Sequence, residues 1–71
     1  NVYPNEVEDA IAALPGVAEV AVIGLPDAKS GEAVKAFVVP QAGRTLTAEQ
    51  VRAHCKERLV AYKLPKEIEI P

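Results

Sequence analysis

The sequence predicts a small α+β domain of two layers, a roughly three-stranded mixed sheet with two helices packed on it. Three observations predict this class: a helical repeat of apolar residues near the start, two neighbouring strand-like runs in the middle, and a capped helical stretch before a final alternating run. The expected order is helix, strand, strand, helix, strand. A right-handed crossover through the second helix should make the last strand parallel to its partner.

The first helix is expected over residues 4–14. Val7, Ile11 and Leu14 fall on one helical face, which should turn toward the sheet. The pair Pro15-Gly16 ends this segment, because proline cannot continue a helix and glycine readily takes a positive φ. Three acidic residues in its first turns complement the positive end of the helix dipole: Glu6, Glu8 and Asp9.

Two strands are expected over residues 17–25 and 33–39, joined by a turn-rich connection over 26–32. Along the second run, alternate residues fall on opposite faces of the sheet. One face carries Val34, Ala36 and Val38, and the other carries Lys35, Phe37 and Val39. Neither face is wholly polar. The helices should therefore cover one face of the sheet, and another protein surface could cover the other face.

The second helix is expected over residues 47–60, after a loop. Thr47 and Gln50 have the spacing of a capping box, in which each residue satisfies a free backbone donor near the helix start. Val51, Cys55 and Leu59 form its apolar stripe. In the final run Ile68 and Ile70 alternate with two glutamates, a pattern typical of a half-exposed strand.

Length and composition bound the possible functions. Seventy-one residues make one small domain, whose single core is marginal at this size. The single cysteine cannot form an internal disulfide, and its being unpaired favours a reducing compartment. One cysteine and one histidine are also too few to favour a metal site. No apolar run approaches the ~20 residues of a membrane helix, and no signal-peptide pattern begins the chain. All eight basic residues follow residue 28, so positive charge is concentrated in the later part of the chain. This charge belongs either to an ordinary solvated surface or to a surface that contacts an anion.

Few residues have the spacing of a catalytic site. His54 and Cys55 are adjacent, so on a helix they point about 100° apart and do not form a nucleophile–base pair. Cys55 is interpreted as a small core residue and His54 as a surface residue. Lys63 and Lys66 are interpreted as a solvated helix exit. The loop from Lys29 to Glu32 is the best candidate for meeting an anion.

Four segments, in order, resemble the C-terminal part of acyl-adenylate-forming enzymes, the group that includes acyl-CoA synthetases, peptide-synthetase adenylation domains and luciferases. They cover nearly the whole chain, and their amino-acid sequences are most similar to those of bacterial long-chain fatty acid–CoA ligases. The segments are Asn1-Val2-Tyr3-Pro4-Asn5-Glu6-Val7-Glu8, then Pro15-Gly16-Val17 with Ala21 to Asp27, then Gly31 to Val39, and finally Tyr62-Lys63-Leu64-Pro65-Lys66.

The resemblance implies that residues 1–71 are one C-terminal AMP-binding-enzyme subdomain, truncated at both ends. A large N-terminal adenylation domain would hold ATP, Mg and the acyl group, and this domain would be its mobile lid. The lid would close once for acyl-adenylate formation and again, rotated, for thioester formation with CoA. The protein is then expected in the cytoplasm, with peripheral contact at the inner membrane allowed, and without a nucleic-acid partner.

The resemblance also bears on individual residues. The family's adenylation lysine lies beyond Pro71, so neither Lys63 nor Lys66 has that role, and no residue here is expected to be catalytic or to bind metal. Asn1 and Ser30 match positions where some relatives place basic residues near CoA, with Gly31 as the turn glycine. Lys29, one residue earlier, is the candidate to replace the missing charge. No cofactor is expected to bind this chain alone.

Two other functions remain open from the residues. The element order equals a ferredoxin-like fold without its first strand, so a free-standing module that binds a small ligand, another protein or nucleic acid is an alternative. A reader of nucleic acid should be basic with aromatic residues on its sheet, whereas this chain has net charge −2. The other alternative is a domain that oligomerises through the sheet face of Phe37 and Val39.

Overall fold

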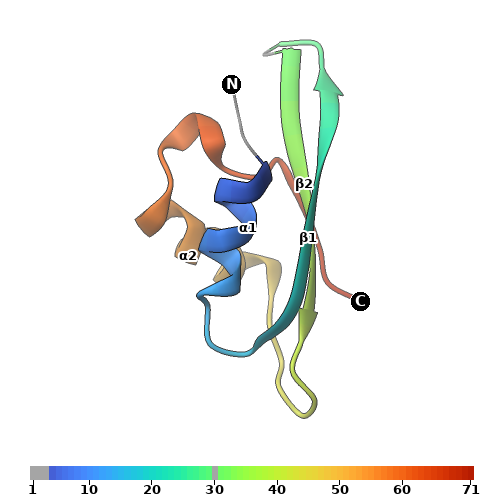
Figure 1. The fold of residues 1–71 in the computed structure, drawn as a ribbon, viewed down its shortest axis with the longest axis vertical. Helices are drawn as coiled ribbons and strands as arrows, with labels where there is room; N and C mark the ends of the chain where they lie inside the picture. Colours follow the sequence, from blue (N-terminus) through green and yellow to red (C-terminus); the bar gives the residue numbers. More distant parts are fainter. Residues whose placement is uncertain (1–3, 30) are drawn as a thin grey trace.

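The computed structural model describes residues 4–29 and 31–71, without the side chains of Glu32 and Tyr62. Helices α1 and α2 lie together on one side of a three-stranded mixed sheet (Figure 1). This arrangement confirms the predicted α+β class and element order. The elements are α1 (Pro4–Ala12), β1 (Val17–Asp27), β2 (Gly31–Pro40), α2 (Ala48–Arg58), a short 3-10 helix η1 (Ala61–Lys63) and β3 (Glu67–Glu69).

Helix α1 buries the predicted apolar face against the sheet. Val7 and Ile11 are fully buried, and Leu14, just past the helix end, packs on the same core. The helix stops at Ala12, two residues before the expected end, and the Leu14 N–H donates to Ile11 O at 3.0 Å in a closing turn. Gly16 has φ +97°, the left-handed conformation that lets the chain turn directly into β1.

The β1–β2 hairpin is longer and its turn tighter than the sequence predicted. The antiparallel register runs from Val17 opposite Pro40 to Asp27 opposite Gly31, which leaves residues 28–30 as the connection in place of 26–32. Proline at position 26 is ordinarily a turn signal. However, β1 is an edge strand of the sheet, where proline can pair without losing a ladder hydrogen bond.

Helix α2 begins at the capping box that the sequence predicted. The Gln50 N–H donates to Thr47 Oγ1 at 3.1 Å, and the Thr47 N–H donates to Gln50 Oε1 at 2.9 Å. The helix ends at Arg58, where the Leu59 N–H donates to Cys55 O. The predicted extension to residue 60 is therefore wrong by two residues, since Leu59 is already extended.

Replacing Thr47 by alanine should lower the free energy of unfolding by about 1 kcal/mol, because the Gln50 N–H loses its acceptor. Urea denaturation followed by circular dichroism would measure the change. Thr45→Ala, in the exposed loop before the cap, is the matched control. An equal loss in both variants would contradict the role of the cap.

Strand β3 pairs parallel to β2, as the crossover rule predicted, with Glu67 opposite Lys35 and Glu69 opposite Phe37. Ile68 lies opposite Ala36 and packs on the core with Ile70. The core therefore forms between the helices and one face of the sheet. Its buried members are Val7, Ile11, Val22, Val34, Ala36, Val38, Val51 and Cys55.

Candidate functional site

The hairpin tip carries the described part of the predicted CoA site. Lys29 is exposed in the turn, and Gly31 begins β2 opposite Asp27. The Lys29 N–H donates to Asp27 Oδ1 at 3.4 Å, so the turn backbone is tied to the end of β1. Asn1 and Ser30, the other two predicted site residues, lie outside the described residues. The tip thus presents an ammonium group to solvent, as an anion contact requires.

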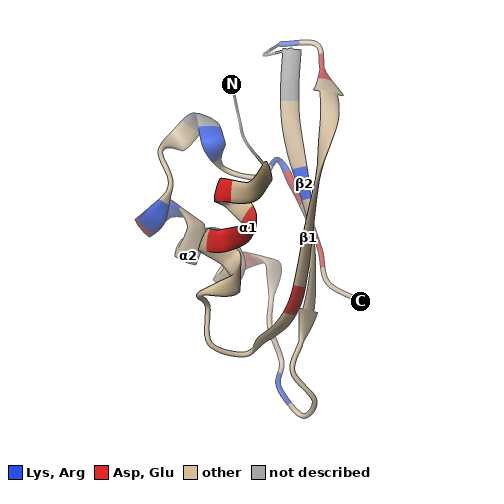
Figure 2. Cartoon of the chain, in the orientation of Figure 1, with Lys and Arg blue, Asp and Glu red and all other residues tan. Residues whose placement is uncertain are grey.

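Ion pairs hold the segment after α2, which adds to the interpretation of Lys63 and Lys66 as a solvated helix exit. Lys66 is 58% exposed, but both lysines are paired. Lys63 Nζ lies 2.6 Å from Glu6 Oε2 on α1, and Lys66 Nζ lies 3.1 Å from Asp27 Oδ1 on β1. Figure 2 shows the same complementarity, with the basic end of η1 beside the acidic first turns of α1. Sequence spacing gave no signal for these pairs, because 57 and 39 positions separate the partners.

His54 is buried, so its assignment to the surface is wrong. Its side chain is 8% exposed, and Nε2 lies 2.6 Å from the carbonyl oxygen of Ala10 on α1. That carbonyl is among the last four of α1, which have no partner within the helix. The spacing from Val51 to His54, three residues along the buried face of α2, was the sequence signal for this burial.

The short contact with Ala10 assigns the proton to His54 Nε2, because a carbonyl oxygen can only accept. Arg58 Nε lies 3.0 Å from the same nitrogen. A protonated Nε2 has no lone pair for this second donor, so the two hydrogen bonds are alternatives. The carbonyl contact is the shorter one and joins α2 to α1 across the helical layer.

Cys55 is a core residue, as predicted. It is fully buried, and desolvation raises the pKa of its thiol while the nearby Arg52 charge partly opposes this. A buried thiol with a raised pKa stays protonated near neutral pH and is a poor nucleophile. The geometry gives Cys55 a role in packing.

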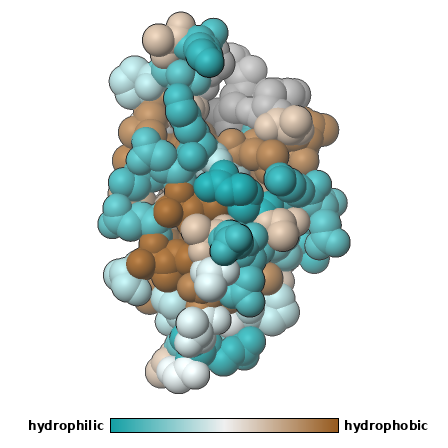
Figure 3. Space-filling view, turned by 180° about the vertical axis from the view of Figure 1, so that it is seen from behind, coloured by the Kyte–Doolittle hydropathy of each residue, from teal (hydrophilic) through white to brown (hydrophobic). Residues whose placement is uncertain are grey.

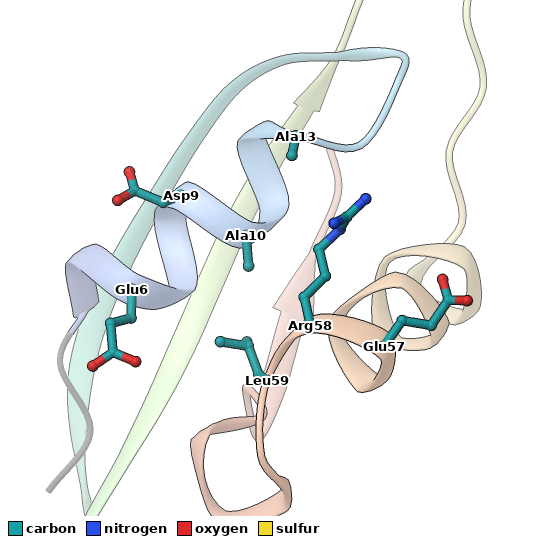
Figure 4. A pocket seen from close by; sticks show the side chains of 7 residues that line it. All are labelled: Glu6, Asp9, Ala10, Ala13, Glu57, Arg58 and Leu59. Carbon is teal, nitrogen blue, oxygen red and sulfur yellow. The ribbon is translucent and has the colours of Figure 1, made fainter.

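A groove of about 590 Å³ separates α1 from the end of α2. In Figure 4, Arg58 and Leu59 extend from the end of α2 toward the side of α1 that carries Ala10 and Ala13. The two alanines are one turn apart, and their small side chains leave this space open. The remaining lining residues are acidic: Glu6, Asp9 and Glu57.

The sheet face opposite the helices combines apolar and charged groups. Lys35 Nζ lies 3.1 Å from Glu69 and 3.8 Å from Glu67, and it stands 4.9 Å from the centre of the Phe37 ring. The hydrogen bond to Glu69 is the main cause that raises the pKa of Lys35. Seen from the side opposite to Figure 1, the surface of the domain as a whole shows apolar patches between hydrophilic ones (Figure 3). The exposed large apolar residues on β1 and β2 are Ile23 and Val39.

The sequence matches a known family over nearly its whole length. The profile of the AMP-binding enzyme C-terminal domain matches residues 6–70. This chain belongs to that family. The membership confirms the resemblance that the four sequence segments indicated.

The relatives of this AMP-binding enzyme C-terminal domain are much longer proteins. The long-chain-fatty-acid–CoA ligase of Escherichia coli O157:H7 is 51% identical over 69 residues, 97% of this chain and 12% of that protein. The solved Mycobacterium tuberculosis fatty acyl CoA synthetase is 48% identical with TM-score 0.86, over 100% of this chain and 14% of that chain. ATP-bound MatB from Rhodopseudomonas palustris is 45% identical with TM-score 0.90, over the same shares. The chain thus spans about an eighth of the length of these relatives.

The described residues hold neither a metal cluster nor a helix that could span a membrane. Within residues 4–29 and 31–71, no three histidine, cysteine, aspartate or glutamate side chains gather as a metal site. None of the described helices is long and apolar enough to cross a membrane.

Proposed function

We propose that this chain is the mobile C-terminal lid of an ATP-dependent acyl-CoA ligase of the long-chain fatty acid class. The observation that carries the proposal is the family match over residues 6–70, together with 51% identity to a long-chain-fatty-acid–CoA ligase. Residues 1–71 then form one domain of a longer protein whose other part is the N-terminal adenylation domain. ATP, Mg and CoA would be used by the whole protein, in the cytoplasm, with peripheral contact at the inner membrane.

The proposed reaction has two steps, and the lid serves each in a different orientation. A carboxylate oxygen attacks the α-phosphorus of ATP and pyrophosphate leaves, which gives the acyl-adenylate. The sulfur of CoA then attacks the acyl carbon and AMP leaves, which gives the thioester. Domain closure of this kind excludes water and completes a different site in each docked state.

The sheet face opposite the helices is suited to reversible docking on the rest of the protein, because it carries both apolar and charged side chains. Ile23 is 45% exposed and Val39 is 36% exposed, so apolar area is available for contact with the rest of the protein. The Lys35 pairs with Glu67 and Glu69 keep charge on the same face. A free-standing ferredoxin-like module is not supported, since the matched domain is only 12–14% of each longer relative described above.

Lys29 is proposed to contact a phosphate of CoA when the lid is in the thioester orientation. Its exposed ammonium group at the hairpin tip is the observation behind this role. In the whole protein, Lys29→Ala should raise the KM for CoA severalfold at most, since one exposed charge contact contributes about 1 kcal/mol or less. Steady-state kinetics with CoA as the varied substrate would measure the change. Lys56→Ala, an exposed lysine on α2, is the control, and an unchanged KM in the Lys29 variant would remove Lys29 from the site.

The function is tested by giving the whole protein ATP, Mg, CoA and a panel of fatty acids of different chain lengths. Mass spectrometry should detect acyl-CoA, AMP and pyrophosphate in equal amounts. The 71-residue chain alone should form neither adenylate nor thioester, because the adenylation domain is needed to hold ATP and the acyl group. Thioester formation by the isolated chain, or none by the whole protein with any carboxylate, would refute the proposal.

A further inference from the structure

The segment of residues 61–66 connects two elements that are far apart in the sequence. At one end, Lys63 Nζ reaches Glu6 Oε2 on the first turn of α1, at 2.6 Å. At the other end, Lys66 Nζ reaches Asp27 Oδ1 at the end of β1, at 3.1 Å. In Figure 1, η1 and the start of α1 lie in the same half of the molecule as the hairpin tip. The 61–66 segment therefore spans from the first helix to the tip.

The middle of the 61–66 segment is itself held in place. Pro65 is fully buried, and its carbonyl oxygen accepts from Arg52 Nη1 on α2 at 3.1 Å. The Lys66 N–H donates to Val34 O on β2 at 2.9 Å. With its backbone fixed to both layers, the segment can hold the two lysine side chains at low entropic cost.

The hairpin tip needs such an anchor, because it extends beyond the three-stranded part of the sheet. Within the described residues, β3 pairs with β2 only from Lys35 to Phe37. The last three pairs of the hairpin, from Leu25 opposite Ala33 to Asp27 opposite Gly31, lie beyond both β3 and the Lys66–Val34 hydrogen bond and have two strands alone. A two-stranded ribbon is only marginally stable in water. The Lys66–Asp27 ion pair joins its far end to the body of the domain.

The same carboxylate oxygen also orients the turn. Asp27 Oδ1 accepts from the Lys29 N–H at 3.4 Å as well as from Lys66 Nζ. Asp27 thus links Lys66 to the backbone of Lys29, the residue proposed to contact CoA. Asp27 is 14% exposed, so its pair with Lys66 is partly shielded from solvent although Lys66 itself is 58% exposed.

We infer that Lys63 and Lys66 are positioning residues, which hold the start of α1 and the hairpin tip in one fixed relation for the CoA-dependent step. The catalytic part of this inference rests on the proposed function, whereas the bracing itself does not. Lys66 acts through Asp27 on the tip, and Lys63 acts through Glu6 on the beginning of α1. Neither lysine needs to touch ATP, the acyl group or CoA.

The test uses the whole protein with Lys66→Met, Lys63→Met, the conservative Lys66→Arg and the control Lys56→Met. Hydrogen exchange followed by mass spectrometry reports the hairpin tip and the start of α1. Lys66→Met should speed amide exchange at residues 27–33 about threefold, the effect expected for loss of one partly exposed ion pair. Lys63→Met should speed amide exchange by a similar factor in the first turn of α1. Lys66→Arg and Lys56→Met should exchange like the unmodified protein.

Kinetics of the same variants give the catalytic readout. Lys66→Met should raise the KM for CoA about threefold, again the size of one exposed pair, while adenylate formation measured by pyrophosphate exchange stays unchanged. Unchanged exchange at the tip in Lys66→Met would overturn the bracing. Faster tip exchange with an unchanged KM for CoA, or an equal loss in both half-reactions, would overturn its link to CoA. If the unmodified protein makes no acyl-CoA, the proposed function fails, and hydrogen exchange still decides the bracing.

Discussion

Ile11→Ala is expected to lower the free energy of unfolding of this chain by about 3 kcal/mol. Ile11 is fully buried and is the largest of the fully buried side chains. Its removal takes apolar area out of the core and leaves a cavity between α1 and the sheet, which packed neighbours fill only partly. A domain of this size has a free energy of unfolding of only a few kilocalories per mole, so the variant should be close to unfolded at 37 °C.

Ile23→Ala provides the matched control for this prediction, because it makes the same chemical change on the exposed sheet face. Ile23 is 45% exposed, and its truncation should cost about 0.5 kcal/mol or less. Urea denaturation of both variants at one temperature gives the two free energies and the m-values. Equal losses in the two variants would show that the helix–sheet layer is not the main core.

His54→Ala is expected to cost about 2 kcal/mol, through two effects at one position. The variant removes buried side-chain volume, and it leaves the Ala10 carbonyl oxygen at the end of α1 without the donor that now lies 2.6 Å away. The contact also joins the two helices, so α1 should loosen against α2. The loss should be visible in thermal unfolding and in faster amide exchange near the end of α1.

His54→Gln separates the hydrogen bond from the packing. The amide N–H₂ of glutamine can reach about as far as Nε2 and donate to Ala10 O, so this variant should recover a large part of the loss. A glutamine variant as unstable as the alanine variant would show that the hydrogen bond contributes little. Arg58→Met should have a small effect, because the Nε2 that donates to Ala10 O cannot also accept from Arg58.

Local patterns in the sequence were enough to place every main element. Val7 and Ile11 marked the buried face of α1, and Thr47 with Gln50 marked the start of α2, because both signals act within a few residues. The direction of β3 followed from the handedness of the crossover and needed no contact information. The bounds of the hairpin were less certain, because proline at position 26 signals a turn except in an edge strand, and edge position is decided by the whole sheet.

The polar contacts of the candidate site could not be predicted from the sequence in the same way. Lys63 and Lys66 find Glu6 and Asp27 only after the chain has folded, since the ion pairs depend on which elements meet at one end of the domain. His54 depended on where the carbonyl end of α1 would lie relative to α2. The exposure of Lys29 at the hairpin tip agrees with its predicted role, but its contact with CoA stays a prediction.

The most direct measurement of the central claim is thioester formation by the whole protein, with and without residues 4–71. The intact protein should convert a long-chain fatty acid, ATP and CoA to acyl-CoA, AMP and pyrophosphate. The protein without these residues should still fold and bind ATP in its N-terminal domain, yet transfer no acyl group to CoA. Acyl-CoA formation at the same rate without residues 4–71 would contradict the account of this domain as a lid that completes the site.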